Sequence, residues 1–203
     1  MRKAIIPILA VLFVIGLLVS SAPIVVAEDS PSFSDTYVEM RDGALLYTRV
    51  YLPDPDIWGP GPYPVILYRT PYGIGTPDSD PRWPVDILLG YVRVDQDTRG
   101  RYSSEGLDHL FYDDSSDGYD TIDWIADQKW CDGNIGAYGY SAPGITAFLA
   151  AGEPHPNLKA IAPLSSSGNL MSDLTFEGGA FRGDSLLWGI GQTVSGLSTI
   201  PGG

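Results

Sequence analysis

Hydrophobic and polar positions change their period several times along the chain, and each change predicts a new element. Short apolar runs, typical of strands, are separated by a run with helical spacing in which Tyr119, Ile122 and Ala126 share one face. Strands that alternate with helices indicate an α/β fold with a mostly parallel sheet. The predicted strands are 37–40, 44–52, 65–68, 91–94, 134–138 and 158–163, and the predicted helices are 84–89, 114–128 and 145–151.

Glycine and proline mark the segments between these elements. Asp42-Gly43 separates the first two predicted strands and supplies the positive φ that a tight hairpin turn needs. Residues 53–64 are rich in proline and glycine and predict a loop. From Phe176 onward, glycines interrupt the pattern around Leu186–Trp188, so the sequence indicates the beginning of a further region without a defined element.

The first 27 residues form a separate unit. Arg2 and Lys3 are the only charges before Glu28. The stretch from residue 4 to Ala27 is almost wholly apolar and ends in small residues. This pattern predicts a cleaved secretory signal peptide. An uncleaved membrane anchor is the alternative, because the stretch is long enough to cross a bilayer. Both interpretations place the bulk of the protein outside the cell, either free or anchored and facing outward. Residues 28–35 are predicted to be a linker.

Composition narrows the possible partners. The formal net charge is −13, which argues against nucleic acid as a partner because phosphate binding needs lysine and arginine. A chain of 203 residues with 44% hydrophobic content can build one domain core. Cys131 is the only cysteine, so an internal disulfide is excluded, and its position beside Trp130 favours a packed residue over a reactive thiol.

Ser141 is the strongest candidate for chemistry. It lies in Gly139-Tyr140-Ser141-Ala142-Pro143-Gly144, between a predicted strand and a predicted helix, where α/β folds can expose a nucleophilic serine. Such a tight turn needs small neighbours, and three of the flanking residues are glycine or alanine. Pro143 departs from the common G-x-S-x-G pattern, but it falls in the first helical turn, where a missing N–H costs little. On this pattern alone, an ordinary serine in a glycine-rich turn remains the alternative.

Neither histidine is expected to serve this serine. Serine triads of this type run in the order Ser, acid, His. His109 precedes Ser141, and His155 follows it with only Glu153 between them, all within one predicted helix and the loop after it. We therefore expect both histidines to be loop residues, and we expect the acid and the base to lie beyond Gly203.

An acidic run spans residues 113–123 and could suggest a calcium loop. Counted from Asp113, Gly118 falls at the sixth position, as an EF-hand requires. The twelfth position is Trp124, where that loop needs a glutamate. We therefore predict no metal site. The arginines of the nearby loop, Arg99 and Arg101, are expected to pair with carboxylates and fix that loop.

Ten short motifs follow one another between residues 37 and 188. They are MRDG at 40–43, VYLP at 50–53, YRTPYG at 68–73, QDTRGR at 96–101, SEG at 104–106, DGYDTIDW at 117–124, WCDG at 130–133, the serine turn at 139–144, HP at 155–156 and LKAI at 158–161. In this order and spacing the chain resembles the family of Xaa-Pro dipeptidyl-peptidases, cocaine-esterase-like (CocE/NonD) hydrolases and α-amino-acid ester hydrolases.

The resemblance implies an α/β-hydrolase core, a helical cap and, in most members, a C-terminal β-sandwich. It implies that residues 36–175 are a partial hydrolase domain and that 176–203 begin the cap. It implies that Ser141 is the nucleophile and that the phenol of Tyr72 and the N–H of Ala142 form the oxyanion hole. The family usually has tyrosine at position 142; alanine keeps the N–H but changes the pocket wall.

These expectations combine into one hypothesis and one alternative. The hypothesis is an exported serine hydrolase, present as its N-terminal portion, that cleaves small-molecule esters or short peptides through an acyl-enzyme on Ser141 without a cofactor. The alternative is a non-catalytic, degenerate module that keeps the fold, either exported or anchored to a membrane. The sequence favours no particular oligomeric state.

Overall fold

A computed structural model describes residues 33–75 and 83–197 of the chain. The predicted signal peptide or anchor lies outside these residues, as does most of the predicted linker. Within the described ranges, no helix combines the length and the apolar character that a membrane span requires. The structural account that follows concerns the α/β unit alone.

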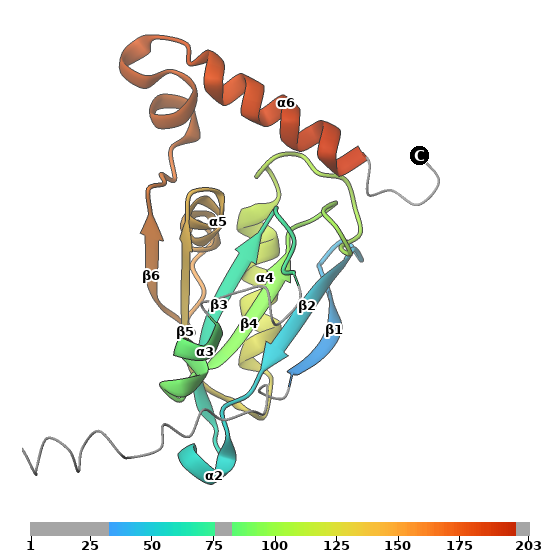
Figure 1. The fold of residues 1–203 in the computed structure, drawn as a ribbon, viewed down its shortest axis with the longest axis vertical. Coiled ribbons are helices and arrows are strands. Elements are labelled where there is room, and N and C mark those ends of the chain that lie inside the picture. Colours follow the sequence, from blue (N-terminus) through green and yellow to red (C-terminus); the bar gives the residue numbers. More distant parts are fainter. Residues whose placement is uncertain (1–32, 76–82, 198–203) are drawn as a thin grey trace, which may run out of the picture. The chain divides into compact units, whose positions relative to one another are not determined.

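A six-stranded sheet in the order β1-β2-β4-β3-β5-β6 forms the centre of the unit (Figure 1). The pairs β1–β2 and β2–β4 are antiparallel, whereas β4–β3, β3–β5 and β5–β6 are parallel. The predicted α/β class with a mostly parallel sheet is therefore confirmed. The strands are β1 (Phe33–Glu39), β2 (Leu45–Tyr51), β3 (Tyr63–Thr70), β4 (Val92–Asp97), β5 (Cys131–Tyr140) and β6 (Leu158–Leu164).

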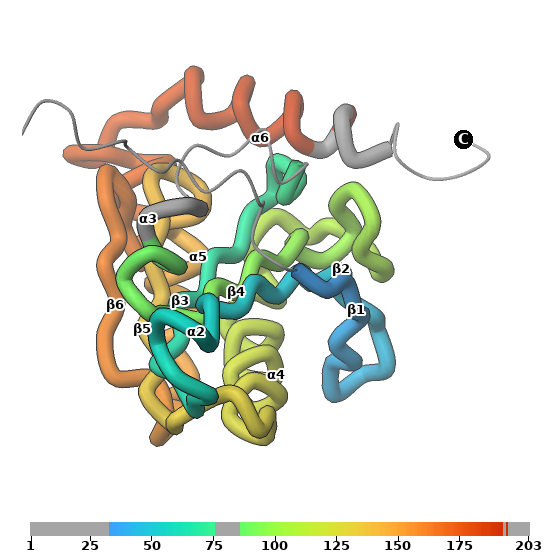
Figure 2. Tube along the Cα trace, turned by 60° about the horizontal axis from the view of Figure 1, so that its bottom comes forward, coloured from blue at the N-terminus to red at the C-terminus, as the bar shows by residue number. Residues whose placement is uncertain are grey.

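Helices cover both faces of this sheet. Two of them, α4 and α5, pack against each other on one face, while α3 lies on the opposite face (Figures 1 and 2). The helices are α2 (Pro55–Trp58), α3 (Trp83–Leu88), α4 (Asp114–Ala126), α5 (Ala142–Ala150) and α6 (Gly183–Leu197), with a π-helical turn, η2 (Met171–Thr175), and a 3-10 turn, η3 (Glu177–Gly179), before the last.

The hydrophobic core lies between the sheet and the α4–α5 pair. Ile122 and Ile125 of α4 pack onto the apolar side chains of β3, β4 and β5. Ala126, predicted to share a face with Ile122, packs against the same core and is partly buried, as is Tyr119. Gly118 turns inward: a Cβ there would lie 2.7 Å from the Cβ of Ala150 in α5. Close contact between the two helices therefore fixes the rotation of α4.

Several boundaries differ from the predicted ones. Phe33 begins β1, so 33–35 belong to the sheet and not to the predicted linker. The Asp35 carboxylate of β1 pairs with Arg49 of the neighbouring strand, β2, at 2.6 Å, and the two residues lie opposite each other in the sheet. The predicted loop 53–64 contains the single turn of α2, which Asp54 caps by accepting the N–H of residue 56. β4 continues three residues past the predicted end, as far as Asp97.

The largest difference lies after residue 176, where the sequence predicted no defined element. The structure has a 15-residue helix there, α6, which runs beyond the carboxyl ends of the parallel strands (Figures 1 and 2). Glycines at 183, 189, 191 and 196 lower its intrinsic helix propensity and obscured the pattern. Several of its apolar side chains, such as Leu187 and Val194, remain exposed.

Candidate active site

Ser141 occupies the turn between β5 and α5. Its backbone has φ 62° and ψ −125°, a left-handed conformation that a residue with a side chain adopts only where the surroundings enforce it. Its N–H donates to the carbonyl of Leu164 at 2.9 Å, and its own carbonyl accepts the N–H of Gly144 at 2.9 Å and of Ile145 at 3.0 Å. These bonds hold the strained turn, and the serine itself stays exposed.

The turn closes because its two glycines have no side chains. A methyl group at Gly139 would overlap the carbonyl of Pro143, and one at Gly144 would lie 2.8 Å from the carbonyl oxygen of Gly139. Pro143 sits in the first turn of α5 and is buried there. The spacing of the two glycines, five residues apart, thus has a steric reason, and the departure at position 143 leaves the turn intact.

Tyr72 lies on the loop that follows β3, 69 positions before Ser141 in the chain. Its phenol interacts with the side chains of Ser141 and of Trp188 in α6, and both interactions lower its pKa. Its N–H donates to the hydroxyl of Thr70 at 3.1 Å, and 41% of its surface is exposed. Burial raises the pKa of the phenol, so it keeps its proton at neutral pH and can donate to an oxygen atom. The structure therefore brings the expected pair, Tyr72 and Ser141, together.

Ala142 is the first residue of α5. Backbone N–H groups in the first turn of a helix have no acceptor within the helix, so the N–H of Ala142 belongs to a set that can bind an anionic oxygen. Its methyl group is buried, with 1% of the residue exposed, and forms part of a cavity wall beside Ile145. Alanine at this position therefore leaves the N–H in place and makes the wall small and apolar.

A cavity of about 180 Å³ opens at the serine. A second cavity, of about 570 Å³, adjoins it and is almost entirely apolar; Trp188, Leu174 and Ser185 line both. Trp188 also stacks on Phe111, with ring centroids 5.9 Å apart. The smaller cavity is lined by Ser141, Ala142, Ile145, Leu174, Arg182, Asp184, Ser185 and Trp188. The segment after residue 170 thus forms the roof over the serine.

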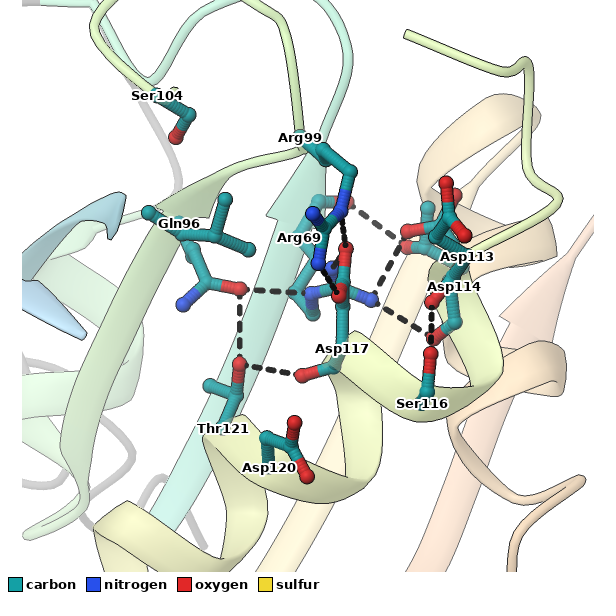
Figure 3. A network of polar contacts seen from close by, with 12 residues as sticks. Arg69, Gln96, Arg99, Ser104, Asp113, Asp114, Ser116, Asp117, Asp120 and Thr121 are labelled. Atoms are coloured by element: carbon teal, nitrogen blue, oxygen red, sulfur yellow. Dashed lines mark hydrogen bonds and ion pairs between the residues drawn. The ribbon is translucent and has the colours of Figure 1, made fainter. Parts of the chain in front are cut away.

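A buried polar network joins the start of α4 to the ends of β3 and β4 (Figure 3). Arg69 is almost fully buried and pairs with Asp114 at 2.9 Å. Arg99 pairs with Asp117 at 2.6 Å and with Asp42 of the β1–β2 turn at 2.7 Å. The prediction that Arg99 fixes its loop through carboxylates is confirmed. These ion pairs hold the start of α4 against β3, the loop after β4 and the β1–β2 turn.

The acidic run at the start of α4 is oriented toward these arginines. Asp114 and Asp117 point to Arg69 and Arg99 (Figure 3), and burial raises the pKa of Asp114. Within the ranges that the structure describes, no three His, Cys, Asp or Glu side chains are grouped to hold a metal ion. Asp114 and Asp117 therefore serve buried ion pairs, whereas Asp120 pairs with the exposed Arg41.

Both histidines are loop residues, as predicted, and their contacts are made around α4. The Nδ1 of His109 lies 2.8 Å from Asp113. The Nδ1 of His155 accepts the N–H of Asn157 at 3.1 Å, so its Nε2 carries the hydrogen and faces Asp123 at 3.3 Å. Neither imidazole is directed at the serine.

Two contributors to the site were missed in the sequence, and a third, Arg101, makes a contact that was not predicted. Trp188 reaches Tyr72 from α6, an element that the sequence did not reveal. Asp97 accepts the N–H of Ile74 at 2.8 Å and so anchors the loop that carries Tyr72; burial raises the pKa of this carboxyl to about 6. Arg101 was predicted to pair with a carboxylate, and it does so with Asp108 at 3.1 Å, but it also reaches α6. Of the two missed residues, only Asp97, a polar residue at the end of a strand, could have been recognised from the sequence.

A strained serine between a parallel strand and a helix, with a phenol beside its hydroxyl, defines an α/β-hydrolase site. The chain belongs to the X-Pro dipeptidyl-peptidase (S15) family, whose model matches residues 42–199. It is 39% identical over 171 residues to the cocaine esterase of a Rhodococcus species, which covers 82% of this chain and 29% of the relative. The chain thus spans less than a third of that relative.

Solved structures agree with this assignment. A CocE/NonD family hydrolase from Staphylococcus aureus superposes with a TM-score of 0.72 at 28% identity, covering 83% of this chain and 34% of that one. An α-amino acid ester hydrolase superposes with a TM-score of 0.57 at 32% identity, covering 68% of this chain and 25% of that one. The predicted α/β-hydrolase fold and the family resemblance are therefore confirmed.

Proposed function

We propose that this chain carries the nucleophile and the oxyanion hole of an exported serine hydrolase that cleaves ester or amide bonds through an acyl-enzyme on Ser141. The observation that supports this most directly is the strained backbone of Ser141 with the neutral phenol of Tyr72 at its hydroxyl. A pocket roofed by Trp188 next to the serine gives an acyl or leaving group a place to bind.

The proposed reaction follows from these groups. The Oγ of Ser141 attacks the substrate carbonyl carbon, and its proton passes to a general base. The carbonyl oxygen becomes negative and receives hydrogen bonds from the phenol of Tyr72 and the N–H of Ala142, each worth a few kcal/mol. The tetrahedral intermediate then expels the alcohol or amine, which takes up that proton. Water attacks the acyl-enzyme by the same route and releases the acid.

The base is assigned to a part of the protein outside the described residues. His109 and His155 contact Asp113 and Asp123, so neither stands behind Ser141. The chain also spans only 29% of the cocaine esterase it matches. Sequence beyond Gly203 would then supply both the acid and the histidine.

Small esters and short peptides are the proposed substrates. Two proteins similar to this chain are a cocaine esterase and an α-amino acid ester hydrolase, and its family is that of the X-Pro dipeptidyl-peptidases. All three act at a carbonyl carbon with an alcohol or amine as leaving group. The apolar lining of the larger cavity favours a carbon-rich substituent over a charged one.

Export is proposed from Arg2, Lys3 and the apolar stretch that ends at Ala27. If the segment is cleaved, the secreted protein begins at Glu28; if it is an anchor, the intact chain stays with the membrane. Intact-mass measurement of the culture supernatant and of the membrane fraction distinguishes the two. Intact protein in the cytosol alone would contradict both.

Labelling with a fluorophosphonate tests the nucleophile. The protein is expressed from its complete coding sequence, reacted with the reagent and digested for peptide mapping. We expect the label on Ser141 and its loss in Ser141→Ala, whereas Ser103→Ala, a change at another exposed serine, keeps it. Label that persists in Ser141→Ala would overturn the assignment.

A further inference from the structure

Arg101 connects three segments that meet above the sheet. Its side chain is only 3% exposed. The Nε donates to the carbonyl of Pro71 at 2.9 Å, and the Nη1 pairs with Asp108 at 3.1 Å. On α6, Gln192 accepts from both terminal nitrogens, through its backbone carbonyl and, at 2.9 Å, through its side-chain Oε1. One buried guanidinium thus joins the residue before Tyr72 to α6.

A second link runs from the same helix to the same loop. Trp188 lies four positions before Gln192, so both project from one side of α6. Its indole interacts with the phenol of Tyr72 and lines the cavity that opens at Ser141. The backbone on one side of Tyr72 and the tip of its side chain are therefore both held from α6, directly or through Arg101.

The direction of the Trp188 interaction matters for chemistry. An indole N–H can only donate, so the phenol oxygen of Tyr72 is the acceptor. The hydroxyl hydrogen of Tyr72 is then left for Ser141 or for the oxygen of a substrate carbonyl. Burial has the larger effect and raises the pKa of this phenol, whereas Trp188 and the charge of Arg101 act in the opposite direction. Both partners strengthen the phenol as a donor.

We propose that Arg101 and Trp188 are positioning residues that couple the docking of α6 to the orientation of Tyr72, so that the oxyanion hole is complete only when this helix is seated. The inference rests on the proposed function and adds residues to it. Arg101 acts through the carbonyl of Pro71, and Trp188 acts through the phenol itself. Neither touches the reacting atoms.

Steady-state kinetics on 4-nitrophenyl acetate test the coupling in protein made from the complete coding sequence. Arg101→Met removes the donors and the charge at similar length, and Trp188→Phe removes the N–H but keeps a ring against Phe111. We expect kcat to fall about tenfold in each, less than the 10²–10³ that loss of a whole oxyanion donor costs, while KM changes less than threefold. Arg101→Lys keeps the charge and should recover part of kcat.

A double-mutant cycle with Tyr72→Phe separates positioning from general destabilisation. If Arg101 acts through the phenol, Arg101→Met costs little further kcat once that phenol is gone. Arg41→Met, which removes an exposed arginine paired with Asp120 and Glu153, is the matched control and should leave kcat unchanged.

Two results would overturn the coupling. One is a tenfold loss from Arg101→Met that persists in the Tyr72→Phe background, and the other is a full kcat in both Arg101→Met and Trp188→Phe. Either result can occur while Ser141 is still labelled, so the coupling can be disproved while the assignment of the nucleophile stands. Activity that survives Ser141→Ala would instead remove the proposed function, and the coupling with it.

Discussion

Ser141 and Tyr72 show how much of this site depends on the conformation of single residues. The serine accepts a left-handed backbone that its neighbours enforce, and burial raises the pKa of the phenol further above neutral pH. The strained serine and the phenol meet although they come from two segments that are distant in sequence. Such a pattern is expected where a site is organised before its substrate arrives.

Replacing Tyr72 by phenylalanine tests the oxyanion assignment. The ring and its packing remain, but the donor is lost, so we expect kcat to fall by about 10²-fold with little change in KM. The measurement is hydrolysis of 4-nitrophenyl acetate by protein from the complete coding sequence. Tyr112→Phe, at a tyrosine that is 83% exposed, is the control. An unchanged kcat in Tyr72→Phe would remove this residue from the oxyanion hole.

Asp97 predicts a pH dependence of stability. Burial raises the pKa of its carboxyl to about 6 in the folded protein, compared with an ordinary value of 3.8. The contribution of Asp97 to stability is therefore fully present below pH 3.8 and is lost as the pH rises through 6. The difference of about two units corresponds to about 3 kcal/mol.

Asp97→Asn measures this effect, because the amide oxygen can still accept the N–H of Ile74 and cannot ionise. We expect the Tm of the variant, relative to the parent protein, to rise from pH 4 to about pH 6 and then to level off. Asp127→Asn, at an exposed aspartate, is the control. A constant difference between variant and parent across this range would mean that Asp97 does not titrate there.

At the scale of elements, two glycines in helices predict opposite outcomes. Gly118 of α4 faces α5, and a methyl group there would lie 2.7 Å from the Cβ and 2.8 Å from the Cα of Ala150. Gly191 of α6 has nothing within 4 Å of such a methyl group. We expect Gly118→Ala to destabilise the fold by about 1–3 kcal/mol. Gly191→Ala should stabilise its helix by about 1 kcal/mol.

Urea unfolding provides the measurement, since a shift in midpoint at constant slope reports a change in stability. The two variants carry the same chemical change in the same kind of element, so each is the control for the other. Equal effects in both would mean that the close approach of α4 and α5 does not determine the packing.

The elements that the sequence revealed are those whose pattern is local. The buried strands around Val65 and Val92 and the serine turn follow from apolar runs and glycine spacing, and the structure agrees with them. α6 remained hidden because its glycines weaken the local preference and its seat depends on partners far along the chain, among them Arg101. Trp188, the part of the site that the sequence did not reveal, lies on this helix, so it could not be predicted either.

At the scale of the whole molecule, Ser141 needs a group that takes its proton. The described residues contain two histidines, and both are held near α4: His109 by Asp113, and His155 by Asp123 and by the N–H of Asn157. A histidine that acts as general base needs its free nitrogen within hydrogen-bond reach of the serine. The contacts of both histidines are directed elsewhere.

We therefore predict that the variant carrying His109→Gln and His155→Gln reacts with a fluorophosphonate at close to the parental rate per folded molecule. His155 is buried, so the folded fraction is first measured by circular dichroism, and the rate of labelling is divided by it. The complete coding sequence provides the protein. A loss of labelling of more than a hundredfold after this correction would place the base among the described residues after all. A retained rate would mean that the serine and its oxyanion partners are built by this α/β unit, while the base that activates the serine comes from another part of the protein.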